Sequence, residues 1–130
     1  MIPKFNFFGR DAKFHHIGIV VNSIKSISPY SKIFIDKIQN VYVAFVSLNG
    51  VTIELIEPLN DISPVTQSLK KGIKFMHICY EVINIDKTLK KCRKYGFHCI
   101  AKPVPAIAFG NRKIAWVYSK EYGLFELLQK

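Results

Sequence analysis

Two similar segments of the chain each place a histidine inside an apolar, strand-like run. The first is KFHHIGIVV, residues 13–21, and the second is KFMHICYEV, residues 74–82. Both follow the period-two alternation that is typical of a half-buried strand. Phe14-x-His16-Ile17 aligns with Phe75-x-His77-Ile78 at an offset of 61 residues. This duplication restricts the fold, because a repeated strand predicts two similar units within one chain of 130 residues.

Later strands repeat as well. Residues 43–46, VAFV, align with residues 114–117, IAWV, and IEL at 53–55 aligns with FEL at 125–127. We therefore expect an α+β fold in a single domain, residues 1–130, built from two pseudo-symmetric βαβββ repeats. The repeats are predicted at 14–58 and 75–129, with a linker that carries a short helix at 59–74. One small sheet cannot bury its own face, so the two repeats should pair into a half-barrel around a cavity.

Local patterns locate the elements of these repeats. Strands are expected at 14–21, 31–36, 41–48, 51–58, 75–82, 97–103, 112–119 and 124–129. Asn49-Gly50 is a strong signal for a two-residue hairpin turn. Segment 22–30 carries three serines and a proline, so at most a turn or two of helix is expected there. Ser63-Pro64 favours a short helix that ends at Gly72, and residues 86–95 have the clearest helical periodicity.

The composition limits the kinds of molecule that this protein is expected to bind. A net charge of +10 favours an anionic partner, but the lysines are dispersed and no nucleic-acid-binding motif is present. No apolar stretch approaches the roughly 20 residues that span a bilayer, and the first residues do not resemble a secretion signal. The three cysteines, at 79, 92 and 99, lack metal-knuckle or disulfide spacing. We expect a cytoplasmic protein with a small, anionic substrate, and neither nucleic acid nor membrane as partner.

Each repeat places a histidine in its first strand and a glutamate in its last: His16, Glu54, His77 and Glu126. A buried glutamate costs several kcal/mol if it has no partner. A lone histidine in a strand is usually a core residue and a lone glutamate usually faces solvent. The doubled pattern instead favours convergence of all four side chains on one divalent metal ion. By strand alternation His15 should point to the opposite face, as a structural or exposed residue. Cys79 lies on the same face as His77 and could line the cavity, although a small buried side chain is the commoner explanation. His98 is assigned no role.

The segments HHIGIVV, VAFVSLNGVTIELIEPLNDISPV and MHICYEVINIDKTL resemble the vicinal oxygen chelate superfamily, which includes glyoxalases, bleomycin resistance proteins and dioxygenases. The resemblance covers residues 14–129, and the methylmalonyl-CoA epimerase-like branch is the most similar. It implies a glyoxalase-like fold and a homodimer. It also implies one divalent ion (Ni, Co, Mn, Fe, Zn or Mg), held by His16, Glu54, His77 and Glu126.

The same resemblance implies a metal-dependent epimerase or isomerase that acts at a carbon next to a carbonyl group. Glu126 would be the catalytic base, with Glu54 as its pseudo-symmetric counterpart. A glyoxalase I-type lactoylglutathione lyase and a non-catalytic small-molecule-binding module of the same fold remain alternatives. Two features depart from the enzymes. The epimerases' extra acidic base has no match near IDKIQNV, where Asp36 is off register, and the first half shows no glutathione-binding arginine.

The loop at 103–111 could cover the cavity or could be a plain surface connection. Arg112 and Lys113 follow it. They could meet an anionic group of the substrate, although solvated surface residues are the commoner explanation.

Overall fold

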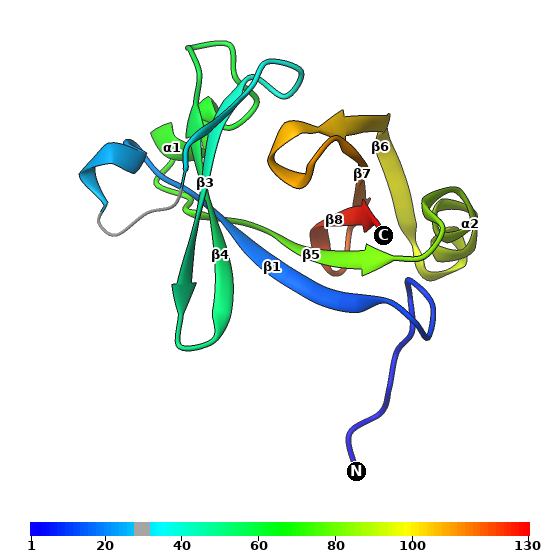
Figure 1. Ribbon diagram of the computed structural model, residues 1–130. Coiled ribbons are helices and arrows are strands. Elements are labelled where there is room, and N and C mark those ends of the chain that lie inside the picture. Colours follow the sequence, from blue (N-terminus) through cyan, green and yellow to red (C-terminus); the bar gives the residue numbers. More distant parts are fainter. Residues whose placement is uncertain (28–31) are drawn as a thin grey trace.

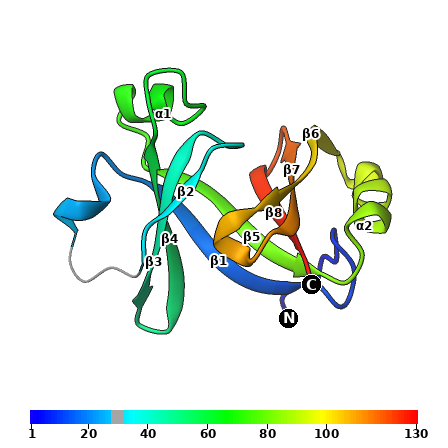
Figure 2. The ribbon, with the colours of Figure 1, turned by 45° about the horizontal axis from the view of Figure 1, so that its top comes forward.

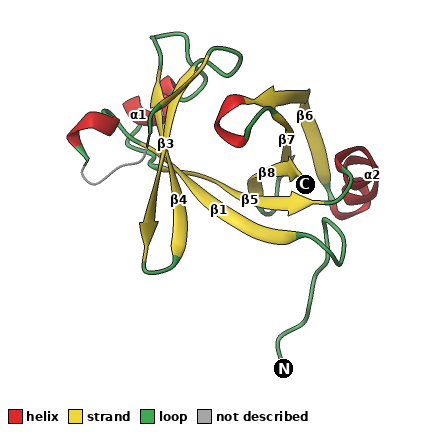
Figure 3. Ribbon diagram, in the orientation of Figure 1, coloured by secondary structure: helices red, strands yellow, loops and turns green. Residues whose placement is uncertain are grey.

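The computed structural model describes residues 1–27 and 32–130. Eight strands form one sheet that curls into a half-barrel, with only short helices beside it (Figures 1 and 3). The α+β half-barrel expected from the sequence is confirmed. The strands are β1 (Lys13–Val20), β2 (Phe34–Asp36), β3 (Val41–Leu48), β4 (Val51–Pro58), β5 (Phe75–Val82), β6 (Phe97–Ala106), β7 (Arg112–Ser119) and β8 (Gly123–Gln129).

Two α-helices and three 3₁₀ turns complete the secondary structure of the described residues. The helices are α1 (Thr66–Lys70) and α2 (Ile85–Lys91), which lie at opposite ends of the molecule (Figures 1 and 2). The turns are η1 (Ile24–Ser26), η2 (Cys92–Tyr95) and η3 (Ile107–Phe109). Within the part of the chain that is described, no helix combines the length and the apolar character that crossing a bilayer would require.

The strand order is β2-β3-β4-β1-β5-β8-β7-β6. β1 and β5 pair antiparallel at the middle of the sheet. Each is flanked on its other side by a parallel partner, β4 beside β1 and β8 beside β5. The strands that carry the repeated histidines and glutamates are therefore four consecutive neighbours. This mirrored order agrees with two repeats, while the residue bounds of the repeats stay a prediction.

In each half, a side chain at the equivalent position accepts a hydrogen bond from the first N–H group of the helical segment. The carboxylate of Glu57 accepts a hydrogen bond from the backbone N–H of Ile24 at 2.7 Å. In the second half, the side-chain oxygen of Gln129 accepts from the N–H of Ile85 at 2.8 Å. Because both acceptors lie three residues after the repeated glutamate, the last strand of each half satisfies an N–H group that the start of a helical segment leaves unpaired.

The hairpin predicted at Asn49-Gly50 is confirmed. Both residues have positive φ, 48° and 86°, as a two-residue turn of this type needs, and β3 and β4 pair without a break up to Leu48 and Val51. The helix expected from Ser63 is shorter than predicted. It begins at Thr66, and the Ser63 hydroxyl is buried without a hydrogen-bond partner rather than capping it.

Two other boundaries differ from the prediction. β6 continues past Pro103 to Ala106, because it is an edge strand and its register against β7 shifts between Ala101 and Val104, so that Pro103 lies in an irregular part of the ladder. The strand expected at 31–36 is observed at Phe34–Asp36. Residues 28–31 lie outside the described part of the chain, so the end of the turn expected at 22–30 and the start of that strand do too.

Candidate metal centre

His16, Glu54, His77 and Glu126 lie on the four central strands β1, β4, β5 and β8. Their side chains converge at one point, and all four are buried, with exposed fractions of 0, 5, 0 and 1%. Strand register explains the convergence, since Gly18 of β1 lies opposite both Glu54 and His77, while Cys79 of β5 lies opposite both His16 and Glu126. The structure thus brings together every residue of the predicted set, and their role as metal ligands stays a prediction.

The spacing of the four groups fits a single cation. The Nε2 atoms of His16 and His77 are 3.2 Å apart. Glu126 Oε1 is 3.1 Å from His16 Nε2 and 3.3 Å from His77 Nε2, and Glu54 Oε1 is 3.4 Å from each. With metal–ligand bonds of about 2.1 Å, adjacent ligand atoms are about 3.0 Å apart in an octahedron and about 3.4 Å apart in a tetrahedron.

Hydrogen bonding among the buried groups is incomplete. Glu126 Oε1 and His77 Nδ1 are buried without a hydrogen-bond partner. The donor set combines two imidazoles and two carboxylates, which suits Zn, Ni, Co, Mn or Fe and does not select one of them. An unpartnered carboxylate oxygen that faces two imidazole nitrogens, in a site with this spacing, is what a cation would satisfy. The four residues therefore fit a divalent metal ion.

The buried charges shift the titration of the histidines and of Glu54. Burial lowers the pKa of His77, but the adjacent carboxylates of Glu126 and Glu54 outweigh it and raise the pKa to about 9. The pKa of His16 is raised, again because the two glutamates outweigh burial. For Glu54, burial raises the pKa, but the two adjacent imidazoles outweigh it, and the pKa falls to about 2. Protons on the imidazoles thus compete with a metal ion for the same nitrogens.

The glycine of the HHIGIVV segment makes room for one of the two imidazoles. The ring of His77 lies directly against Gly18, where an added Cβ would be 2.1 Å from His77 Cε1, 2.4 Å from Nδ1 and 2.7 Å from Nε2. Gly18 is opposite His77 in the β1–β5 ladder. Any side chain at position 18 would consequently push this ring away from the other three groups.

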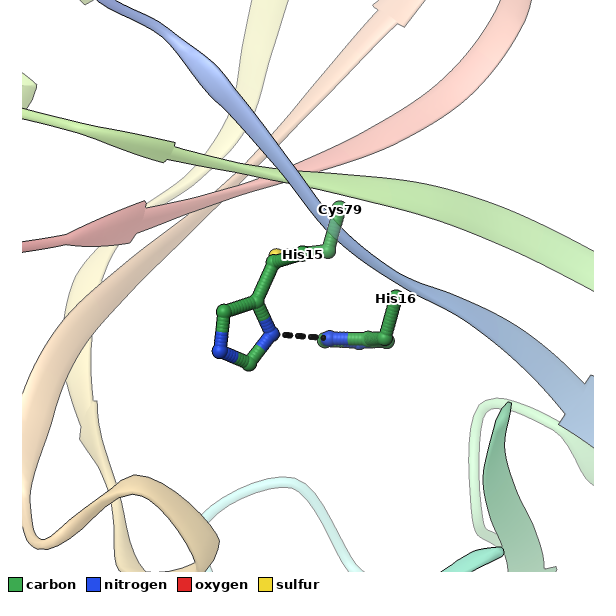
Figure 4. Close-up of side chains that lie close together, drawn as sticks. All are labelled: His15, His16 and Cys79. Atoms are coloured by element: carbon green, nitrogen blue, oxygen red, sulfur yellow. Dashed lines mark hydrogen bonds between the residues drawn. The ribbon is translucent and has the colours of Figure 1, made fainter. Parts of the chain in front are cut away.

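His15 is not on the face that strand alternation predicts, so this expectation is wrong. The register of β1 against β5 shifts between Phe14 and His16, which makes His15 the extra residue of a β-bulge. Its side chain turns to the same side as that of His16, and the two Nδ1 atoms are 2.8 Å apart (Figure 4). Cys79, which is fully buried as expected, lies beside them, and burial raises the pKa of its thiol.

A cavity of about 650 Å³ opens beside the four groups. Both carboxylates line it, whereas His16 and His77 are fully buried behind them. Aliphatic and aromatic side chains from both halves form most of the wall. The cavity could therefore hold a largely apolar molecule whose reacting end meets Glu54 and Glu126.

Gln39 is a cavity residue that the sequence did not reveal. Its side-chain NH₂ group and its backbone N–H both donate to the Asp36 carboxylate, at 2.9 Å each. Its side-chain oxygen accepts from Trp116 Nε1 at 3.0 Å, and the Trp116 ring packs edge-on against His77. Gln39 thus joins the loop before β3 to β7 of the other half. No local pattern marks such a contact between halves.

The basic residues suggested from the sequence do not line the cavity. Arg112 pairs with Glu81 at 2.9 Å and donates to the backbone oxygen of Phe109 at 3.3 Å. The described basic side chain in the cavity wall is Lys102. The loop expected to cover the site does approach it, because the Phe109 ring stacks on His16 with centroids 5.5 Å apart. His98 is exposed, and its role remains unassigned.

Comparison with known proteins agrees with this geometry. The profile of the glyoxalase/bleomycin resistance protein/dioxygenase superfamily matches residues 15–116. An ethylmalonyl-CoA/methylmalonyl-CoA epimerase of Cereibacter sphaeroides is 32% identical over 95 residues, which cover 68% of this chain and 69% of that protein.

Solved structures share the fold. A hypothetical protein from Bacillus halodurans superposes with a TM-score of 0.80 at 28% identity, covering 93% of this chain and 96% of the other. The methylmalonyl-CoA epimerase of Mycobacterium tuberculosis superposes with a TM-score of 0.76 at 20% identity, covering 89% and 86%. The glyoxalase-like fold expected from the sequence is confirmed. The chain belongs to the glyoxalase/bleomycin resistance protein/dioxygenase superfamily, in its methylmalonyl-CoA epimerase-like branch.

Proposed function

We propose that this protein is a divalent-metal-dependent epimerase or isomerase that moves a proton at the carbon next to a carbonyl group. The observation that carries the proposal is the buried centre of two imidazoles and two carboxylates, whose carboxylates border a cavity of about 650 Å³. The similarity to an ethylmalonyl-CoA/methylmalonyl-CoA epimerase supports a coenzyme A thioester as the substrate. A thioester of this kind is anionic, which suits the net charge of +10.

His16, Glu54, His77 and Glu126 would hold the ion, which would polarise the substrate carbonyl and make the neighbouring C–H more acidic. Glu126 would accept the proton, and Glu54, its counterpart in the other half, could return one from the other side. Each carboxylate would offer one oxygen to the ion, so its second oxygen could supply the lone pair that takes the proton. The apolar cavity wall would exclude water from the reacting carbon.

The contents of the cavity support the choice of the two glutamates as bases, and the resemblance to the epimerases favours Glu126. Of the described residues that line it, only Glu54 and Glu126 are acidic. Asp36, the acidic residue near the segment where epimerases carry their extra base, is buried and accepts two hydrogen bonds from Gln39. Proton transfer to and from the substrate would therefore depend on the two carboxylates of the metal centre.

The same observation favours a second candidate. An isomerisation that needs only one carboxylate base, as in a glyoxalase I-type lyase acting on a thiol adduct, requires no acidic residue beyond Glu54 and Glu126. The identity of the substrate separates the two candidates. Absence of both reactions in a protein that still binds a small molecule would indicate a non-catalytic binding module.

The test combines metal analysis with solvent-exchange kinetics. We expect one divalent ion per chain and incorporation of deuterium from ²H₂O into methylmalonyl-CoA. In the Glu126→Gln variant the exchange rate should fall at least about 100-fold, since general acid–base catalysis contributes about 10²–10⁴-fold. His98→Gln, which changes an exposed histidine, is the control. Exchange into a methylglyoxal–glutathione adduct instead would select the lyase, and full activity of Glu126→Gln would exclude this residue as the base.

A further inference from the structure

We infer that His15 is a positioning residue that fixes the tautomer and the orientation of His16. It thereby raises the affinity of the centre for its metal ion. The inference rests on the proposed function, because it takes His16 as a metal ligand. It starts from the β-bulge in β1, which turns His15 toward His16 instead of away from it (Figure 4). Bulges near functional sites commonly redirect one side chain in this way.

The distance between the two rings determines where their protons lie. His15 Nδ1 and His16 Nδ1 are 2.8 Å apart, a hydrogen-bond distance, so one atom must donate and the other must accept. His16 Nε2 faces both glutamates, at 3.4 Å from Glu54 Oε1 and 3.1 Å from Glu126 Oε1. Nε2 is therefore the nitrogen of His16 that can bind a metal ion at the point where the four side chains meet. A ligand nitrogen carries no proton, so the proton of His16 must be on Nδ1. His15 therefore accepts through Nδ1 and carries its own proton on Nε2.

Packing holds both rings in this arrangement. The Phe109 ring stacks on His16 with an interplanar angle of 23°, and it meets the His15 ring edge-on with centroids 5.5 Å apart. Arg112 donates from Nε to the backbone oxygen of Phe109, which ties the η3 turn to β7. His15 itself is half-buried. The acceptor is thus held in place by contacts that do not involve the metal ligands on the other strands.

The second half lacks this arrangement. Met76 precedes His77 as His15 precedes His16, and a thioether does not replace an imidazole acceptor. His77 Nδ1 is buried without a hydrogen-bond partner. The two imidazoles of the centre are consequently inequivalent. Partners of this kind, which orient a ligand histidine, typically contribute 10- to 100-fold to metal affinity, and His15 supplies one to His16 alone.

A competing use of the same atoms is a second metal site. One donor atom from each of His15, His16 and Cys79 lies within 4.8 Å of the others. In that arrangement His15 would bind a cation directly and His16 would need both nitrogens deprotonated. The hydrogen-bond distance between the two Nδ1 atoms favours the shared proton, and the stoichiometry of metal binding distinguishes the two cases.

The test compares zinc affinities, measured by chelator competition, in three variants. His15→Phe keeps an aromatic ring against Phe109 but removes the acceptor. His15→Asn places Oδ1 at the same number of bonds from Cβ as the lost Nδ1. We expect a 10- to 100-fold loss for His15→Phe, a loss of less than about threefold for His15→Asn, and no change for the exposed control His98→Gln. Wild-type affinity in His15→Phe, or a larger loss in His15→Asn than in His15→Phe, would show that packing alone matters and would overturn the inference.

Nitrogen-15 NMR of the zinc-loaded wild-type protein tests the tautomers directly. We expect the proton of His16 on Nδ1 and that of His15 on Nε2. Two bound zinc ions, one of which is lost in Cys79→Ala, would make His15 a ligand and would overturn the positioning role while leaving the proposed function intact. A wild-type protein that binds no divalent metal at all would overturn both proposals together.

Discussion

Replacing Gly18 by alanine should disable the metal centre without touching any of its four groups. The new Cβ would lie 2.1 Å from His77 Cε1, whereas carbon atoms in contact are about 3.5–4.0 Å apart. The His77 ring must therefore move by more than about 1 Å, because the backbone of β1 is fixed between β4 and β5. Metal sites tolerate deviations of only about 0.2 Å in ligand distances. We expect His77 to stop acting as a ligand.

The expected loss of zinc affinity follows from the loss of one of the four ligands. Loss of a partner that merely orients a ligand histidine costs about 10- to 100-fold in affinity, so displacement of the ligand itself should weaken zinc binding by more than about 100-fold. Inserting a methyl group into a filled site typically costs about 1–3 kcal/mol of folding stability. Zinc affinity by chelator competition and urea unfolding of the metal-free protein measure the two effects separately.

Two controls decide whether the clash is the cause. Gly50→Ala adds the same methyl group at a positive φ with nothing within 4 Å, so it should destabilise the hairpin and leave zinc affinity unchanged. In a His77→Ala background the Gly18→Ala change should cost almost no stability, because the ring it collides with is gone. Normal zinc affinity in Gly18→Ala, or an equal stability loss in both backgrounds, would refute the reasoning.

Three further predictions concern charge, contact and reactivity. Burial lowers the pKa of His77, but the two buried carboxylates raise it from 6.5 to about 9. This stabilisation of the metal-free fold is complete below pH 6.5 and is lost as pH rises through about 9. The free energy of unfolding should fall by about 3 kcal/mol over that range, and a flat urea-unfolding profile would contradict this. Trp116→Phe removes the hydrogen bond to Gln39 and should cost about 1 kcal/mol in thermal unfolding, whereas an unchanged transition would show that the bond contributes nothing. Because burial raises the pKa of the Cys79 thiol, a thiol reagent at pH 8 should label exposed Cys99 but reach Cys79 only after unfolding, and rapid labelling of Cys79 would disprove its burial.

The fold and the meeting of four side chains could be anticipated because both depend on regular repetition. Period-two patterns place residues on a face of a strand, and equal spacing in two halves places them near a common axis. The hairpin at Asn49-Gly50 was predictable for a local reason, since the turn needs two residues with positive φ. Each of these features can be predicted from residues within a single strand, turn or repeat.

The features that the sequence did not reveal depend on partners distant along the chain. The orientation of His15 follows from a register shift against β5, and strand alternation within β1 predicts the opposite face. Gln39 reaches the cavity because Trp116 of the other half holds its side chain. The extension of β6 through Pro103 depends on its position at the sheet edge. Edge position and bulges are properties of the assembled sheet, so they are not visible in a local pattern.

The placement of the centre across the β1–β5 boundary has a consequence for the origin of this architecture. Each half contributes one imidazole and one carboxylate, on strands that are neighbours within that half. A primitive chain of half this length would offer only two donors, and it could surround a cation only by associating with an identical copy. Gene duplication and fusion would convert that encounter between separate molecules into a permanent internal junction, after which the two copies could diverge, as His15 and Met76 have done.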